Sequence, residues 1–206
     1  MFLFVLALLL SALAGSIPSA YIAGKVVLKE DIRTLGSGNA GATNVLRVMG
    51  LKAALPVFFV DFCKGFIPVL CIVFFGSNGW PLSPLHTALI AGVLSFLGHV
   101  YSPFIGFRGG KGMATGAGVF SALVPFSSLV CLFFFCLVFF ISHKASLASL
   151  AASVTLPFAY IGIVIIRGNV LDPFLLTASI IVPCVVIIRH RKNIINLLKG
   201  EERPLF

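Results

Sequence analysis

The sequence predicts an all-α integral membrane protein with seven transmembrane helices, its N-terminus outside and its C-terminus in the cytoplasm. Of its 206 residues, 59% are hydrophobic and only 10% are charged, whereas soluble domains carry roughly 25% charged residues. The mean hydropathy is +1.12. The basic residues separate the apolar segments and fall almost entirely on one side of this topology. The length predicts a single membrane-embedded domain, residues 1–206.

The first apolar segment, residues 2–24, is expected to be a retained helix rather than a cleaved signal peptide. No basic residue precedes it, and the first lysine is Lys25. A helix with charges only at its C-terminal end prefers its N-terminus outside. Apolar length predicts four further spans at residues 53–75, 84–104, 147–166 and 171–188.

The apolar segment 112–141 has Pro125 near its middle. A single helix over this segment would be about 45 Å long, against a hydrocarbon core of about 30 Å. Two short helices meeting at Pro125 place Lys144 and the basic tail, residues 189–206, in the cytoplasm. A single span would place them outside, against the positive-inside rule. We therefore expect seven helices and a net charge of +9 that mainly faces the cytoplasm, where it favours anionic lipids and substrates.

A loop of three glycines and a lysine, Gly109, Gly110, Lys111 and Gly112, lies at the edge of a predicted span. In this glycine–lysine loop, backbone N–H groups can approach an anion closely and form a concave nest for phosphate oxygens. The lysine adds a charge, and a helix beginning at about Gly112 directs its positive end there. The loop is not a Walker A motif, because Ile105 replaces the first glycine and Gly112 replaces the Ser/Thr. It indicates a phosphorylated substrate at the membrane surface.

A second set of small polar residues, Gly36–Asn44, follows the first span between Arg33 and Arg47. This first loop formally matches G-x-G-x-x-G, but a dinucleotide site needs a preceding strand, and here a membrane helix precedes. We expect it to re-enter the bilayer edge and line a cavity. An ordinary flexible turn is the alternative.

Several ionisable side chains lie in or beside the predicted spans. Asp61 and Lys64 must face the bundle interior, where they either neutralise each other or contact substrate. His99 either orients the glycine–lysine loop or makes a structural hydrogen bond. His190 and Asn193 share a face if the last helix continues; a plain positive-inside anchor is the alternative reading of this basic segment.

These motifs resemble, in order and spacing, those of the bacterial acyl-phosphate-dependent glycerol-3-phosphate acyltransferases, the PlsY family. The resemblance rests on the first loop with Arg47, the Asp61-x-x-Lys64-Gly65 segment, Gly98–Thr115 and His190-x-x-Asn193. It implies a seven-helix inner-membrane enzyme of phospholipid biosynthesis. Such an enzyme moves a fatty acyl group from acyl phosphate to glycerol 3-phosphate, giving lysophosphatidic acid and inorganic phosphate.

The resemblance also implies the site. Lys111, His190 and Asn193 would be catalytic, and the implied substrate-binding residues are Ser37, Gly38, Asn39, Gly41, Thr43, Asn44, Arg47, Gly109, Gly110 and Gly112. No metal, other cofactor or nucleic acid is expected. The expected partners are membrane lipids, the two substrates and the enzyme that forms the acyl phosphate. The chain departs from the family pattern at residues 100–102 and 143–145, which leaves a role for Ser146 open.

The sequence lacks the motifs of enzymes that must activate a less reactive acyl donor. It has no His-x-x-x-x-Asp, no Gly-x-Ser-x-Gly elbow and no cluster of metal-ligand residues. An acyl phosphate is already activated, so orientation and stabilisation of the departing phosphate would suffice, with that phosphate accepting the hydroxyl proton. A small transporter of phosphorylated solutes and a non-catalytic scaffold are the alternatives, although the sequence shows no internal repeat.

Overall fold

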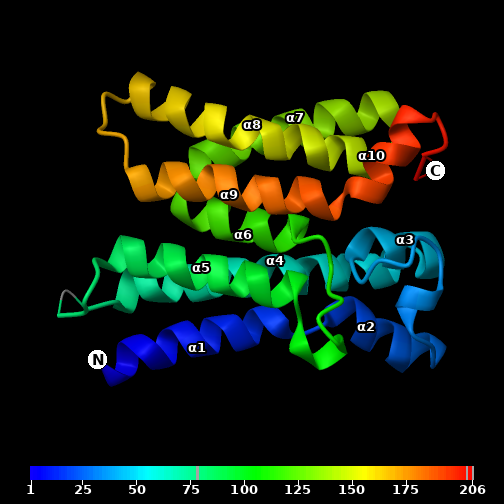
Figure 1. Ribbon diagram of the computed structural model, residues 1–206, viewed down its shortest axis with the longest axis horizontal. Helices are drawn as coiled ribbons and strands as arrows, with labels where there is room; N and C mark the ends of the chain where they lie inside the picture. The colour runs from blue at the N-terminus through cyan, green and yellow to red at the C-terminus, as the bar shows by residue number, and fades with distance from the viewer. Residues whose placement is uncertain (78, 203, 206) are drawn as a thin grey trace. The chain divides into compact units, whose positions relative to one another are not determined.

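The structure is a computed structural model that describes residues 1–77, 79–202 and 204–205. These residues form helices, turns and loops, and no strand occurs among them. The predicted all-α class is therefore confirmed. The chain divides into two compact units, Met1–Leu123 and Val124–Phe206. In Figure 1 the first unit is coloured from blue to green and the second from green to red.

The first unit contains four longer helices joined by shorter elements. The longer helices are α1 (Phe2–Ser16), α4 (Leu51–Phe75), α5 (Pro84–Val100) and α6 (Met113–Leu123). The shorter elements are α2 (Ser19–Ala23), the π-helix η1 (Gly24–Leu28), the 3-10 helix η2 (Ile32–Thr34), α3 (Ala42–Met49) and the 3-10 helix η3 (Pro103–Ile105). They place two loops between helices, and these are the two loops that the sequence singles out.

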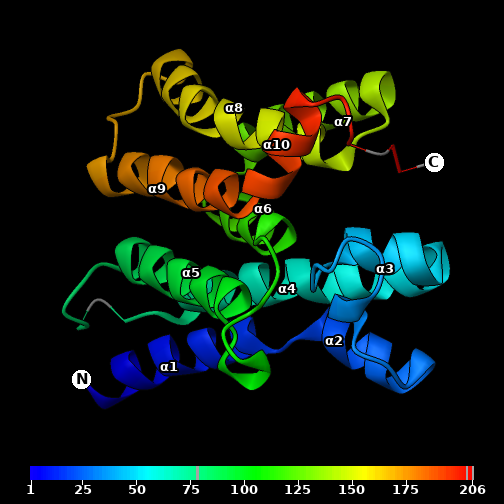
Figure 2. The same cartoon turned by 45° about the vertical axis from the view of Figure 1, so that its right-hand side comes forward.

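Small residues allow the helices of the first unit to pack closely (Figure 2). α1 lies along α5 where Gly15 meets Ser95, and α4 lies along α6 where Gly65 meets Thr115. A methyl group on either glycine would overlap the backbone of the other helix. Such contacts are typical of membrane helices, because lipid tails provide no hydrophobic drive between helices and close packing must replace it.

Buried apolar clusters join the helices of the first unit, and two of them lie among its described residues. One joins α4, α5 and α6 through Val69, Ile72, Ala88, Ala91 and Val119. The other joins α2, η2, α3 and α4 through Ala20, Ile32, Val45, Ala54 and Val57. The second cluster fixes both ends of the first loop, since Ile32 precedes the loop and Val45 follows it.

The second unit contains α7 (Pro125–Ser142), α8 (Ala145–Ile166), α9 (Pro173–Arg189) and α10 (Arg191–Leu198). α8 packs against both α7 and α9 (Figure 1). Asp172 caps the N-terminus of α9, because its Oδ1 accepts hydrogen bonds from the backbone N–H groups of Phe174 and Leu175, each at 2.9 Å. Pro173 stands at the first helical position, where its missing N–H costs no hydrogen bond.

Among the described residues, four helical segments are long and apolar enough to cross a membrane: Leu51–Phe75, Pro84–Ile105, Pro125–Ser142 and Ala145–Ile166. The number rises to six if each of two bent pairs forms one span. These pairs are Phe2–Ser16 with Ser19–Leu28, bent by 43°, and Pro173–Arg189 with Arg191–Leu198, bent by 63°. Met113–Leu123 is a shorter apolar helix. A multi-span membrane protein is thus supported, while the count of seven spans and the orientation of the termini stay predictions.

Helix boundaries agree with the sequence prediction in one place and differ in another. The predicted break at Pro125 is present, because α6 ends at Leu123 and α7 begins at Pro125. The predicted continuous helix over residues 2–24 is instead interrupted after Ser16. Pro18 explains the interruption, since proline lacks the N–H that would continue the helical hydrogen bonds.

Candidate active site

The first loop folds around the side chain of Asn44, which is fully buried near the start of α3. Its Oδ1 accepts hydrogen bonds from Ser37 N at 2.7 Å and from Ser37 Oγ at 3.0 Å. Its Nδ2 donates to the carbonyl oxygens of Ile32 at 3.0 Å and Leu35 at 3.1 Å. Four hydrogen bonds therefore engage this amide within the protein, so Asn44 gives the loop its shape. The first loop is a closed structure rather than a flexible turn.

α3 presents a polar face beside this loop. Thr43 and Arg47 are four residues apart on the helix and are both exposed, whereas Asn44 and Val45 are buried. Ser37 and Gly38 are also exposed, and Asn39 is half-buried. Gly41 is buried, like Asn44. The predicted substrate-binding residues of this region thus divide into two buried residues and a set of surface groups that can meet a ligand.

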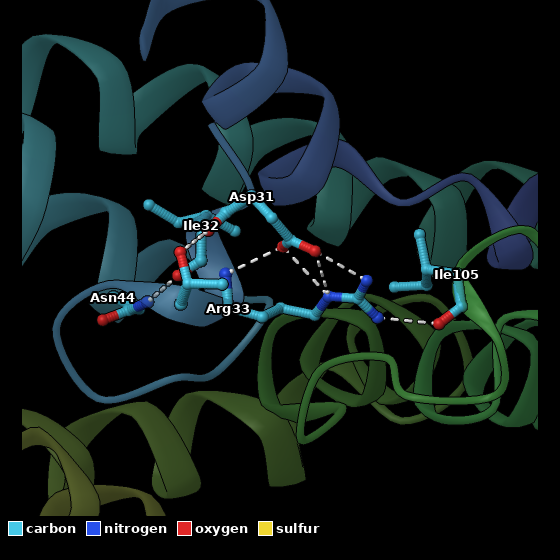
Figure 3. A network of polar contacts seen from close by, with 6 residues as sticks. Asp31, Ile32, Arg33, Asn44 and Ile105 are labelled. Carbon is cyan, nitrogen blue, oxygen red and sulfur yellow. Dashed lines mark hydrogen bonds and ion pairs between the residues drawn. The ribbon is translucent and has the colours of Figure 1, made fainter. Parts of the chain in front are cut away.

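An ion pair that sequence reasoning missed connects the first loop to a distant segment (Figure 3). The Nε and Nη2 of Arg33 donate to the carboxylate of Asp31, with Nη2 at 2.7 Å from Oδ2. Nη1 of Arg33 donates to the carbonyl oxygen of Ile105 at 2.7 Å. Sequence analysis treated Arg33 only as one positive charge. The geometry shows that it ties the base of the first loop to the turn that leads into the glycine–lysine loop.

The electrostatics of this pair follow from the same contact. The hydrogen bond from Arg33 favours the ionised carboxylate and holds the pKa of Asp31 below its ordinary value. The hydrogen bond to Asp31 likewise raises the pKa of the Arg33 guanidinium. The pair is partly exposed, so it serves mainly to orient the arginine toward Ile105 rather than to stabilise the fold.

The glycine–lysine loop lies against the end of α5 and against the first loop. Gly109 N donates to the carbonyl oxygen of Val100 at 3.2 Å. A Cβ added to Gly110 would overlap the imidazole Nε2 of His99 and would stand 2.9 Å from the carbonyl oxygen of Ala40. The two loops that the sequence singled out are therefore neighbours in the first unit.

The last residues of the glycine–lysine loop lead directly into α6. Gly112 has φ +87°, and a Cβ there would overlap the ring of Phe96, so both backbone conformation and space require glycine. α6 begins at the next residue, as the sequence predicted, and directs its N-terminal end toward the loop. Gly109, Gly110 and Gly112 are buried, while Lys111 is half-buried.

In the second unit, the predicted His190 stands at the junction of α9 and α10. The last helix does not continue straight, because it bends by 63° here. The Nδ1 of His190 is 2.8 Å from the carbonyl oxygen of Val186. Since a carbonyl oxygen only accepts, Nδ1 carries the proton, and in the neutral ring Nε2 is the atom with a lone pair. His190 is buried and is thus held in one orientation by its own helix.

Asn193 and Ser146 meet at a carboxylate that sequence reasoning did not identify. Asn193 Nδ2 donates to Oε1 of Glu202 at 2.6 Å, and Ser146 Oγ donates to the same atom at 2.7 Å. The tail also returns to the α7–α8 turn, where Leu205 N donates to the carbonyl oxygen of His143 at 2.8 Å. The only sequence signal for Glu202 is an acidic pair in an otherwise basic tail. Its partners are separated by many residues and only folding brings them together.

The predicted site residues thus form two groups. The first unit brings together the first loop, Arg47 and the glycine–lysine loop, and the second unit brings together Asn193, Ser146 and Glu202 near His190. Among the described residues, no three His, Cys, Asp or Glu side chains are placed to hold a metal ion. The chemistry available consists of glycine N–H groups, cationic side chains, an imidazole and amides, which suits anionic substrates.

Comparison with known proteins agrees with this chemistry. The family model described as glycerol-3-phosphate acyltransferase matches residues 5–200. A glycerol-3-phosphate acyltransferase of Staphylococcus carnosus (strain TM300) is 44% identical over 200 residues, covering 96% of each chain. One from Staphylococcus haemolyticus (strain JCSC1435) is 42% identical with the same coverage.

Solved structures are similar over almost the whole chain. The glycerol 3-phosphate form of PlsY (YgiH), an integral membrane glycerol 3-phosphate acyltransferase, superposes with a TM-score of 0.79 at 38% identity. This match covers 96% of this chain and 94% of that one. The form of PlsY with lysophosphatidic acid gives a TM-score of 0.80 at 37% identity, with coverage of 98% and 94%.

Proposed function

Because this chain belongs to the glycerol-3-phosphate acyltransferase family, we propose that it takes the acyl group from an acyl phosphate and holds the donor phosphate in the glycine–lysine loop. The single observation that carries this proposal is the contact between the two loops: Gly110 lies against both His99 and the carbonyl oxygen of Ala40. A donor phosphate in one loop would therefore lie close to an acceptor in the other. The products are lysophosphatidic acid and inorganic phosphate.

The acceptor, glycerol 3-phosphate, binds at the first loop and the exposed face of α3. Arg47 offers a planar guanidinium that matches two phosphate oxygens, and Ser37 and Thr43 offer hydroxyl groups beside it. Gly38, Asn39 and Gly41 contribute backbone or amide contacts. Asn44 supports this site from within, since its amide already bonds to the loop.

The reaction needs no protein nucleophile. The acceptor hydroxyl attacks the carbonyl carbon of the acyl phosphate, the bond to the bridging oxygen breaks, and the departing phosphate accepts the hydroxyl proton. Lys111 and the glycine N–H groups stabilise the charge that grows on this phosphate. His190 and Asn193 belong to the catalytic residues that the family resemblance implies, and the hydrogen bond to Glu202 fixes the amide of Asn193.

The membrane arrangement belongs to the same proposal. The chain crosses the membrane seven times with its N-terminus outside, acts as a single domain, and faces the cytoplasm with both loops and the tail. α6 would then be a short span that depends on local thinning of the bilayer or on neighbouring helices. The active site would lie on the cytoplasmic side of the inner membrane, where the acyl-phosphate-forming enzyme can deliver its product.

The direct test is an assay of the purified protein with palmitoyl phosphate and radiolabelled glycerol 3-phosphate. Formation of lysophosphatidic acid with release of inorganic phosphate supports the proposal, and reaction only with a thioester donor contradicts it. Flux of phosphorylated solutes into proteoliposomes without acyl transfer would identify a transporter instead. A trapped covalent acyl-enzyme would contradict the direct attack.

Replacing Arg47 with alanine should mainly weaken the use of glycerol 3-phosphate. Loss of a bidentate contact raises the KM for the acceptor, by about tenfold to 10²-fold for a charge-assisted pair. If the contact tightens as charge develops, kcat falls as well. Steady-state kinetics with each substrate varied in turn measures the effect. An unchanged KM for glycerol 3-phosphate in the folded variant would remove Arg47 from the acceptor site.

Single cysteines in a cysteine-free background should report the seven-span topology. A cysteine at Lys144 or in the 189–202 tail is expected to react only with a reagent that enters the cytoplasm. A cysteine in the 79–83 segment should react with an impermeant reagent from outside. External labelling of the tail would rule out the seven-span arrangement.

A further inference from the structure

A buried ion pair that takes no part in the proposed chemistry lies inside the first unit. Lys64 Nζ is 2.7 Å from Oδ1 of Asp61, and the two side chains are only 4% and 2% exposed. Lys64 Nζ also donates to the carbonyl oxygen of Ile17 at 2.9 Å, and Ser19 Oγ donates to Oδ1 of Asp61. Ile17 and Ser19 lie on either side of Pro18, which separates α1 from α2. The interrupted helix thus supplies the groups that hold the ion pair in place.

Asp61 and Lys64 neutralise each other's charge, but a third group, the imidazole of His99, also lies beside the pair. The Nδ1 of His99 is 3.6 Å from the same Oδ1 of Asp61, and the His99 ring is 7% exposed. A carboxylate on this side of the ring favours the proton on Nδ1 and thereby turns Nε2 to the opposite side. Asp61 is thus placed where its charge can orient the imidazole.

The opposite side of the imidazole faces the glycine–lysine loop. The space that a Cβ of Gly110 would occupy is taken by Nε2 and Cε1 of His99. The space of a Cβ on Gly109 is taken by the carbonyl oxygen of His99. Both glycines thus rest on the same residue of α5.

We propose that Asp61 and His99 are positioning residues that hold the glycine–lysine loop in its phosphate-binding shape, with Lys64 and Ser19 fixing Asp61. Asp61 stands on one side of the imidazole and Gly110 on the other, so a change at the carboxylate reaches the loop through the ring. Charged groups within a membrane span are costly, and apolar replacements of a buried ion pair are often neutral or stabilising. A role in function rather than in stability accounts for this cluster.

The test separates positioning from stability by removing both charges together. Asp61→Asn with Lys64→Met leaves no unpaired buried charge, so the protein should stay folded in detergent. Ser95→Ala is the matched control, because Ser95 Oγ donates a buried hydrogen bond to the Lys64 carbonyl oxygen and its loss removes no charge. His99→Ala, His99→Gln and the triple variant Asp61→Asn, Lys64→Met, His99→Ala complete the set.

Two measurements are made on each variant: hydrogen exchange of peptides covering residues 101–115, and kcat/KM for palmitoyl phosphate. The double variant should exchange faster in these peptides and lose about tenfold to 10²-fold in kcat/KM, as expected for a misplaced binding group. Adding the double change to His99→Ala should cause no further loss, because both act through the imidazole. His99→Gln should retain more activity than His99→Ala, since its amide can reach the place of Nε2.

The inference rests on the proposed role of the loop as the phosphate site. The two measurements test the positioning role and the phosphate site separately. Faster exchange with unchanged kcat/KM means that Asp61 and His99 hold the loop, as inferred, but that the loop does not bind the donor. Unchanged exchange in the double variant overturns the inference. Independent, multiplicative losses from the Asp61/Lys64 and His99 changes also overturn it.

Discussion

Replacement of Gly110 by alanine is expected to reduce turnover with acyl phosphate by about 10²-fold or more, as for other displaced binding groups. The added methyl group would overlap the His99 imidazole and approach the carbonyl oxygen of Ala40 at 2.9 Å. Either the backbone of the loop or the buried imidazole must therefore move from its place in the structure. Steady-state kinetics on purified protein, with the folded fraction checked by thermal unfolding, measures this effect.

The chain offers a matched control for this change. Gly162 lies within α8, and a Cβ added there meets nothing within 4 Å. Gly162→Ala should leave turnover unchanged, because alanine is favoured over glycine inside a helix. Wild-type turnover in a folded Gly110→Ala protein would mean that the loop is structural and that the donor site lies elsewhere.

Replacement of Lys111 by alanine should lower kcat by roughly 10²–10³, the usual cost of removing a donor to charge that develops in the transition state. Lys111→Arg should not restore activity, because a broad planar guanidinium does not fit the place of a compact ammonium group. Lys111 is half-buried. Kinetics with palmitoyl phosphate and glycerol 3-phosphate measures both variants.

Lys52→Ala is the control for Lys111→Ala, because both changes remove one positive charge. Lys52 is exposed and lies near the start of α4. If Lys52→Ala and Lys111→Ala lower turnover equally, the loss comes from the lower overall positive charge rather than from a hydrogen-bond donor at Lys111. Full activity of Lys111→Arg would likewise contradict a shaped ammonium site.

The sequence predicted those features of the fold that depend on local chemistry. Apolar length located α4, α5, α8 and α9, and Pro125 marked a helix boundary because proline cannot continue a helix. The same rule applied to Pro18 would have predicted the interruption of the first helix. Because residues 2–24 are mostly apolar, they were instead predicted to form one continuous helix.

Contacts between distant segments could not be predicted from the sequence. The sequence showed three motifs: the first loop, the glycine–lysine loop and His190-x-x-Asn193. It did not show which residues these motifs contact. Arg33 bonds to Ile105, and Ser146 bonds to Glu202, across separations that no local pattern encodes. Close packing of helices through small residues determines which residues meet, and many different sequences allow such packing.

The roles of individual polar residues were only partly predictable for the same reason. Asn44 makes four hydrogen bonds within the first loop that the sequence did not predict, and its contact with substrate stays a prediction. Asp61 and Lys64 were expected to face the interior and do so. The approach of His99 to that pair depends on how α5 packs against α4 and was not visible in the chain.

Binding of an unreactive donor analogue tests the central claim most directly. In a palmitoyl phosphonate whose bridging oxygen is replaced by CH₂, the acyl chain and phosphate charge remain but no transfer can occur. Calorimetry of the purified wild type, Gly110→Ala and Gly162→Ala would give the affinities for this analogue and for glycerol 3-phosphate. The account predicts that Gly110→Ala loses affinity for the analogue while Gly162→Ala keeps it. Equal affinity of all three proteins for the analogue would contradict a donor phosphate site in the glycine–lysine loop.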